Sequence, residues 1–287
     1  MLRRWCVLLA MLAVTVGTAL AAGPASAATG LVPGQAGFGG GGQAWPWAPP
    51  GTGNWVPGGP VNGRTFTSHQ GQADSTNWSG YAGTTGTYTS VSATWTQPKG
   101  TCSSGDQYAA FWVGLDGYSS STVEQTGTEV DCDGRTAEYY AWYEAYPAAS
   151  MEYSPTTYPV KAGDVFNASV VYSTTNNDFV LTLTDTSETP NWTATTTVTV
   201  AKAQRSSAEV IAEAPCCTFF GGILPLTDFG TVNFSNAMAN GADLGAASGL
   251  TAITMVDNFG RDKDTVSALT PSGVTGTAFS CTWKASS

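Results

Sequence analysis

Residues 166–183, FNASVVYSTTNNDFVLTL, predict two β-strands joined by a turn. Apolar and polar side chains alternate within 166–170, which is the two-residue period of a half-buried strand, and 179–183 is a short run of Phe, Val, Leu and Thr, which is also typical of a strand. Asn176, Asn177 and Asp178 favour a turn between them, because their short side chains hydrogen-bond nearby backbone groups. This segment therefore predicts strands that turn one face toward a core.

The same strand-like sequence pattern continues through residues 74–287. Thr, Val, Tyr and Trp dominate, Gly and Asn interrupt, residues 196–200 indicate a further strand, and no stretch keeps a helical period. The pattern predicts an all-β fold, a two-sheet antiparallel β-sandwich of the concanavalin or lectin-like jelly-roll type. A chain of this length is long enough to bury a substantial core.

The N-terminal part has a different character. Arg3 and Arg4, an uncharged apolar run over 5–20 and the Ala25-Ser26-Ala27 site have the three-part pattern of a secretory signal peptide over residues 1–27. Residues 28–73 contain no acidic residue and are rich in Gly and Pro, so we interpret them as a linker or a propeptide. The sandwich domain is predicted over 74–287, and the mature protein is expected to be extracellular, free of the membrane and monomeric.

Charge and cysteine usage narrow the possible partners and cofactors. Removal of the signal leaves nine basic and 21 acidic residues, which argues against a nucleic-acid partner because binding phosphates needs basic patches. The remaining five cysteines predict two disulfides and one free thiol, with Cys102–Cys132 as one bridge and Cys281 joined to Cys216 or Cys217 as the other. No paired Cys-x-x-Cys motif is present and His69 is the only histidine, so a zinc site is not expected. No nucleotide-binding loop appears either, so we expect no cofactor.

The single histidine, His69, restricts the chemistry further. It precedes the predicted domain, which excludes Ser-His-Asp and Cys-His sites within that domain. Carboxylates, amides and aromatic side chains remain as possible catalytic groups. Side chains alternate across a strand, so four segments each gather such groups on one face: Trp112, Gly114 and Asp116; Gln125, Gly127 and Glu129; Tyr140, Trp142, Glu144 and Tyr146; and Glu209, Ile211 and Glu213.

Each segment alone has a plainer interpretation. Aromatic rows on strands usually pack in cores, and single glutamates on strands usually face solvent. A carbohydrate-active sandwich, either a glycoside hydrolase or a lectin-like module, is the alternative function, because aromatic faces stack on sugars. A retaining carboxylate pair must lie about 5–5.5 Å apart. Glu124 and Glu129 face opposite sides of a strand, and Glu209 and Glu213 are roughly 13 Å apart on one. A non-catalytic binding module is a third possibility.

Taken together and in order, these segments resemble the glutamic peptidases. This family, also called the eqolisins, comprises acid endopeptidases similar to scytalidoglutamic peptidase. The resemblance indicates a bacterial-type member. The matching pieces are Asn77-Trp78, residues 112–117, Gln125-Thr126-Gly127, Trp142-Tyr143-Glu144 with Tyr146-Pro147, and residues 208–213.

The resemblance implies a sandwich of two seven-stranded sheets and a secreted endopeptidase that cleaves proteins or peptides in acid without a cofactor. It implies Gln125 and Glu213 as the catalytic pair, and Trp78, Trp112, Asp116, Glu129, Trp142, Glu144 and Tyr146 as substrate-binding or supporting residues. Glu129 stands where the fungal enzymes have Asp, Ala145 stands where they have a second Trp, and Ala214-Pro215 follows Glu213 where they often have another acid. The changes at Ala145 and Ala214 bear on substrate preference more than on activity.

Overall fold

The structure is a computed structural model that describes residues 67–69, 71–187, 189–216 and 222–287. The predicted signal peptide and almost all of the predicted linker or propeptide lie outside these residues. Within them the fold is all-β, as predicted, and the only helical element is the short 3₁₀ turn η1 (Leu244–Ala246). No helix in the described part of the chain is long and apolar enough to cross a membrane.

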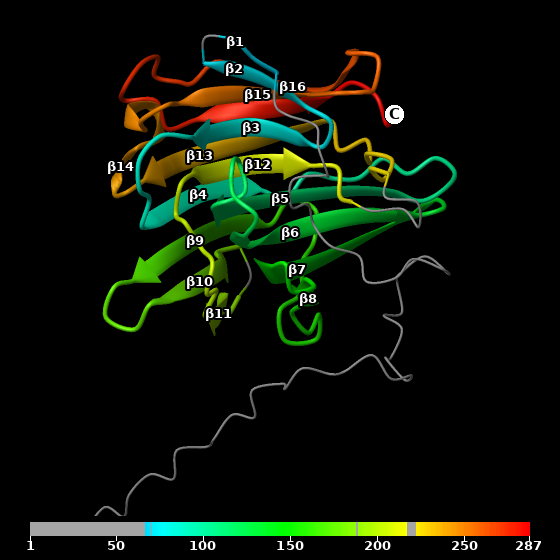
Figure 1. Cartoon of the computed structure of the whole chain (residues 1–287). Helices are drawn as coiled ribbons and strands as arrows, with labels where there is room; N and C mark the ends of the chain where they lie inside the picture. The colour runs from blue at the N-terminus through cyan, green and yellow to red at the C-terminus, as the bar shows by residue number, and fades with distance from the viewer. Residues whose placement is uncertain (1–66, 70, 188, 217–221) are drawn as a thin grey trace, which may run out of the picture. The chain divides into compact units, whose positions relative to one another are not determined.

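The strands form two facing sheets, which we call the site sheet and the outer sheet (Figure 1). The site sheet has the spatial order β1 (Thr67–His69), β2 (Gln72–Ser75), β15 (Thr251–Val256), β3 (Trp78–Gly83), β12 (Ala208–Glu213), β5 (Gln107–Leu115), β6 (Val123–Asp133), β7 (Thr136–Tyr146) and β8 (Met151–Glu152). The outer sheet has the order β16 (Asp262–Val266), β17 (Phe279–Trp283), β13 (Thr231–Ala239), β4 (Ser90–Thr96), β9 (Val165–Ser173), β10 (Asp178–Asp185) and β11 (Trp192–Val198), with the short β14 (Ala242–Asp243) beside β13. Pairing of β15 with β16 joins the two ladders, and among the strands of the described residues only β2 and β15 pair in parallel.

The outer sheet confirms the strand predictions made from its sequence. β9 and β10 pair in antiparallel register, and the turn between them places Asn177 at a φ of 56°. Asparagine tolerates this left-handed conformation better than most residues. The predicted strand at 196–200 is present as the end of β11, which stops at Val198.

The core lies between the sheets. β5 directs Phe111, Val113 and Leu115 into it, as their alternation predicts, and all three side chains are fully buried. The outer sheet contributes aromatic side chains from the opposite side, among them Trp95 and Phe166. Because the odd-numbered residues of β5 fill this core, the even-numbered residues must lie on the other face of the site sheet.

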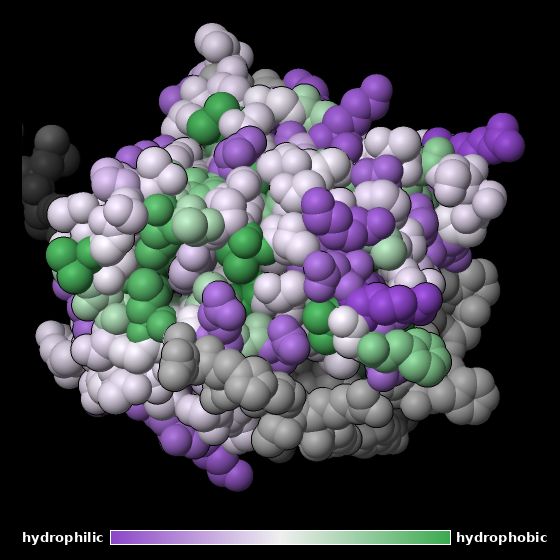
Figure 2. Space-filling view, turned by 90° about the horizontal axis from the view of Figure 1, so that it is seen from above, coloured by the Kyte–Doolittle hydropathy of each residue, from purple (hydrophilic) through white to green (hydrophobic). Residues whose placement is uncertain are grey.

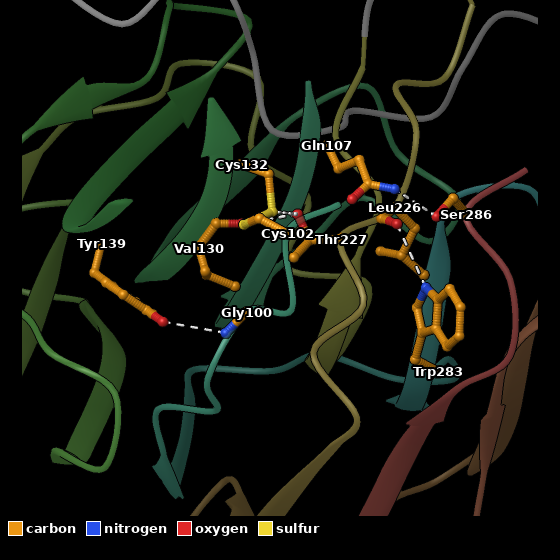
Figure 3. The surroundings of a disulfide bond; sticks show 10 residues. All are labelled: Gly100, Cys102, Gln107, Val130, Cys132, Tyr139, Leu226, Thr227, Trp283 and Ser286. Carbon is orange, nitrogen blue, oxygen red and sulfur yellow. Dashed lines mark hydrogen bonds between the residues drawn. A yellow bond between two sulfur atoms is a disulfide. The ribbon is translucent and has the colours of Figure 1, made fainter. Parts of the chain in front are cut away.

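One disulfide, Cys102–Cys132, confirms the predicted bridge and ties the end of β6 to the loop before β5 (Figure 3). Thr227 reinforces this junction, since its hydroxyl donates to the backbone carbonyl of Val130 at 3.3 Å. Gly100 donates its N–H to the hydroxyl of Tyr139 at 3.1 Å. The disulfide and Thr227 therefore hold the last residues of β6, and Gly100 ties the same loop to β7.

The predicted second bridge through Cys281 is wrong. Cys281 is a free and fully buried thiol on β17, where it points into the core beside Ser79 and Asp264. Cys216 is itself disulfide-bonded, and Cys217, the other partner considered, lies outside the described residues. Strand alternation explains the error, because it turns Cys281 inward with Phe279.

The surface near β1 and β2 mixes neutral, hydrophilic and apolar side chains (Figure 2). The large apolar residues that are exposed are separate in sequence, and Phe259 in the turn between β15 and β16 is the most exposed at 85%. Arg261 lies over its ring at 5.4 Å, which shields part of the apolar surface. Scattered apolar residues of this kind are normal for a solvent-facing surface.

Candidate active site

Strand β12 lies in the middle of the site sheet, between β3 and β5 (Figure 1). The strand registers place Glu213, its last residue, between Trp78 of β3 and Ala110 of β5. The same row continues to Glu129 of β6 and Tyr140 of β7. Ala110 carries only a methyl group, so little side-chain bulk separates Glu213 from Glu129.

Two further rows cross the same face. One contains Glu209, Gly114, Gln125 and Glu144 in adjacent strands. The row between contains Ile211, Trp112, Gly127 and Trp142. The structure therefore brings the side chains of Gln125, Glu213 and most of the predicted supporting residues onto one face, opposite the inter-sheet core.

Two neutral donors hold the carboxyl group of Glu213. Asn77 Nδ2 donates to Oε1 at 3.0 Å, and Trp112 Nε1 donates to Oε2 at 2.7 Å. The hydroxyl of Ser75 fixes the Asn77 amide by donating to its Oδ1 at 3.2 Å. Hydrogen bonds to an ionised group are stronger than those between neutral groups, so these donors orient a carboxylate without cancelling its charge.

The indole of Trp112 spans the space between the two predicted catalytic residues. A Cβ atom on Gly114 would lie 2.8 Å from Cζ3 of Trp112 and 3.2 Å from Cβ of Gln125. The benzene edge of the indole therefore lies over Gly114, close to Gln125, while its N–H reaches Glu213. Trp78 supports the ring edge-on, with 5.1 Å between ring centroids and an interplanar angle of 77°.

This contact makes Gly114→Ala a test of the indole's role. The new methyl group would meet the Trp112 ring at a distance that side chains do not tolerate, so the ring must shift and its bond to Glu213 must lengthen. We expect kcat for the peptide cleavage that the resemblance implies to fall by about 10–100-fold, since 1 Å misplacements have effects of this size. Trp112→Phe, which keeps a ring but removes the donor, should give a similar loss. Activity unchanged in both variants would show that the indole does not position Glu213.

Gln125 is held by a different partner. Its Nε2 donates to Oε2 of Glu144 at 2.5 Å, and the two residues are directly paired between β6 and β7. Burial raises the pKa of Glu144 well above its ordinary value, and the hydrogen bond from Gln125 opposes that shift. The bond fixes which way the amide faces, while the second N–H on the same nitrogen can still donate elsewhere.

A second group of acids lies farther along β6. Asp131 occupies the next position on the face of Glu129, and Tyr140 donates its hydroxyl hydrogen to Oδ2 of Asp131 at 3.0 Å. Burial is the main cause of a raised pKa in both Glu129 and Asp131.

The remaining predicted residues have structural positions. Asp116 follows β5 with a φ of 68°, and its carboxylate accepts backbone N–H groups from Gln204, Arg205 and Ser206 at 2.7–2.8 Å. It therefore anchors the loop that leads into β12. Trp142 is buried among the aromatic residues of the site face, and Tyr146 packs against the same cluster.

Sequence reasoning assigned no role to Asn77 or Asp131. Asn77 belongs to a matching motif, but its bond to Glu213 joins residues 136 positions apart, which alternation cannot reveal. Asp131 could have been found, because it is two residues beyond Glu129 and so shares its face. Among the described residues, no group of three or more His, Cys, Asp or Glu side chains is placed to hold a metal ion.

Residues 76–283 match the family model described as the Peptidase A4 family. The chain belongs to this family, the glutamic peptidases. This glutamic endopeptidase shares its fold with solved structures. The crystal structure of scytalido-glutamic peptidase with a transition state analog inhibitor has a TM-score of 0.59 at 24% identity, and the match covers 73% of this chain and 98% of that one.

Two further structures agree with that fold. SCP-B, described as a member of the eqolisin family in a complex with the tripeptide Ala-Ile-His, has a TM-score of 0.55 at 22% identity, with 73% of this chain and 98% of that chain covered. Aspergilloglutamic peptidase from Aspergillus niger has a TM-score of 0.52 at 23% identity, with 62% and 99% covered. A comparison with curated protein sequences gave no significant match.

Proposed function

We propose that this glutamic peptidase is a secreted enzyme that cleaves proteins in acid, with Glu213 and Gln125 as its catalytic pair. The main support is the geometry of Glu213, a carboxyl group oriented by two neutral donors on the face that it shares with Gln125. The predicted signal peptide and the Cys102–Cys132 disulfide support export to an oxidising compartment.

In the proposed mechanism, ionised Glu213 takes a proton from a water molecule whose oxygen attacks the carbonyl carbon of the scissile bond. The side-chain N–H of Gln125 that is not bonded to Glu144 donates to the oxygen that becomes negatively charged. Glu213 then returns the proton to the leaving nitrogen as the C–N bond breaks. The amide suits its role because its charge does not change with pH.

Acid conditions follow from the surrounding carboxyl groups. Burial raises the pKa of Glu129 and of Glu144, so both hold their protons in acid and add no charge beside Glu213. Glu213 serves as a general base only where it is ionised, so its neighbours must stay protonated at a pH at which Glu213 has lost its own proton. An ionised Glu213 and protonated neighbours are therefore expected together in the acid pH range.

The test uses the purified protein, an unfolded protein substrate and a series of buffers from pH 2 to pH 8. We expect cleavage only below about pH 5, unaffected by a chelator. Gln125→Ala should lower kcat by about 10²–10³-fold, the usual effect of removing one oxyanion donor. Cleavage that is maximal at neutral pH, or that requires a metal, would contradict the proposal.

A further inference from the structure

The carboxyl groups of Glu129 and Asp131 form a pair at one end of the site face. Both side chains are buried, with exposed fractions of 0% and 8%. The two carboxyl groups lie two residues apart on the same face of β6, and neither oxygen of Glu129 has a hydrogen-bond partner among the described residues. Asp131 is therefore the member whose negative charge is better supported, because Tyr140 donates a hydrogen bond to it at 3.0 Å.

The titratable groups around the pair come from five strands. They are Tyr108 on β5, which is paired with Asp131; Asp133 on β6; Glu138 and Tyr140 on β7; Glu152 on β8; and Glu213 on β12. All of these groups are acidic or phenolic, so none supplies a positive charge to neutralise an ionised pair. Burial and repulsion together favour the protonated pair.

The pair is also fixed in place. Asp131 lies between Val130, whose carbonyl oxygen accepts the hydroxyl of Thr227, and Cys132, which is in the disulfide (Figure 3). Movement of this segment away from Glu213 would break both constraints. A negative charge on the pair must therefore act electrostatically on Glu213.

Provided that Glu213 is the catalytic base, as proposed above, we propose that Asp131 and Glu129 stay protonated in acid and that loss of a proton from the pair sets the upper pH limit of catalysis. The charge of Glu213 is one of the causes that raise the pKa of Glu129, so the two sites interact across Ala110. Once the pair ionises, its charge opposes the negative charge that forms on the substrate oxygen. Asp131 is thus a positioning residue that acts through Glu129.

The experiment measures kcat/KM for one peptide from pH 3 to pH 8. Asp131→Asn removes one charge of the pair, so we expect the alkaline limb of the profile to move up by at least one pH unit. This shift makes the variant at least tenfold more active than the wild type on that limb. Asp131→Glu should restore the wild-type profile, and Asp262→Asn, at an exposed position on β16 that is not among the groups around the pair, should leave it unmoved.

A lower kcat/KM at every pH with an unmoved alkaline limb would overturn the inference, because a purely structural role predicts that result. Tyr140→Phe gives an independent test if Asp131→Asn does not fold. Loss of the Tyr140 hydroxyl donor disfavours ionised Asp131, so the alkaline limb of the Tyr140→Phe profile should also move to higher pH. An unmoved alkaline limb in this variant would again overturn the inference. Failure of the wild type to cleave at any pH would count instead against the proposed function.

Discussion

Replacement of Glu213 by Gln is expected to lower kcat in acid by about 10³-fold, within the range for loss of a general base. The variant keeps the size of the side chain but cannot accept a proton from water. KM should change little, because the substrate-binding surface stays in place. The measurement is kcat and KM for one peptide at the acid optimum of the wild type.

Glu209→Gln is the matched control for this variant. Glu209 lies on the same strand and the same face as Glu213, and both side chains are fully buried. We expect less than a tenfold loss there. Comparable losses in both variants would mean that the face needs its carboxylates for folding rather than for chemistry, and a silent Glu213→Gln would remove Glu213 from the mechanism.

A complication in Glu213→Gln is its effect on stability. The carboxylate accepts from both Asn77 and Trp112, whereas a Gln side chain has only one acceptor oxygen and places an N–H against the second donor. A buried donor left without a partner costs about 1–3 kcal/mol. Assays well below the unfolding temperature separate this cost from the loss of chemistry.

The site face was predictable because it depends on strand alternation. Glu209, Ile211 and Glu213 share a face for the same reason that Ala208, Val210 and Ala212 fill the core. Alternation contains no information about register. The alignment of Glu213 with Ala110 and Glu129 depends on pairing among three strands, and those pairings depend on packing across the whole sheet.

Asp116 shows a second limit of reading a strand pattern. Its spacing from Trp112 and Gly114 placed it on the site face, but β5 ends at Leu115 and the chain turns there. A carboxylate at a strand end can accept several backbone N–H groups, and Asp116 accepts three. Strand alternation therefore predicts which face of the sheet a side chain lies on only as far as the strand itself extends.

The register also bears on the carbohydrate alternative. Glu124 and Glu129 emerge on opposite faces of β6, because Glu124 pairs in the row of Leu115 and Glu129 in the row of Ala110. Glu209 and Glu213 share a face but lie at opposite ends of β12, roughly 13 Å apart at the rise of a strand. Neither arrangement gives the separation of about 5–5.5 Å that a retaining glycosidase needs.

The thermal unfolding midpoint is expected to fall by more than about 10 °C between pH 4 and pH 8, with buried Asp264 as a main cause. Burial raises the pKa of Asp264 from 3.8 to about 8. The folded state therefore holds this proton more tightly than the unfolded state. The stabilisation is complete below the unfolded pKa near 4, and it is lost progressively as the pH rises toward about 8. Glu124, whose pKa burial raises to about 9, acts in the same direction.

The variant Asp264→Asn isolates this contribution, because its amide stays neutral at every pH. One pKa unit corresponds to about 1.4 kcal/mol. Removing the ionisation should therefore raise the free energy of unfolding by several kcal/mol at pH 8 and leave it unchanged at pH 4. At about 2–4 °C per kcal/mol for a domain of this size, the midpoint at pH 8 should rise by roughly 10 °C. Asp262→Asn, an exposed position on the same strand, should leave the difference between the two pH values unchanged. A midpoint that does not depend on pH in the wild type would show that Asp264 is paired or hydrated enough to ionise in the folded protein.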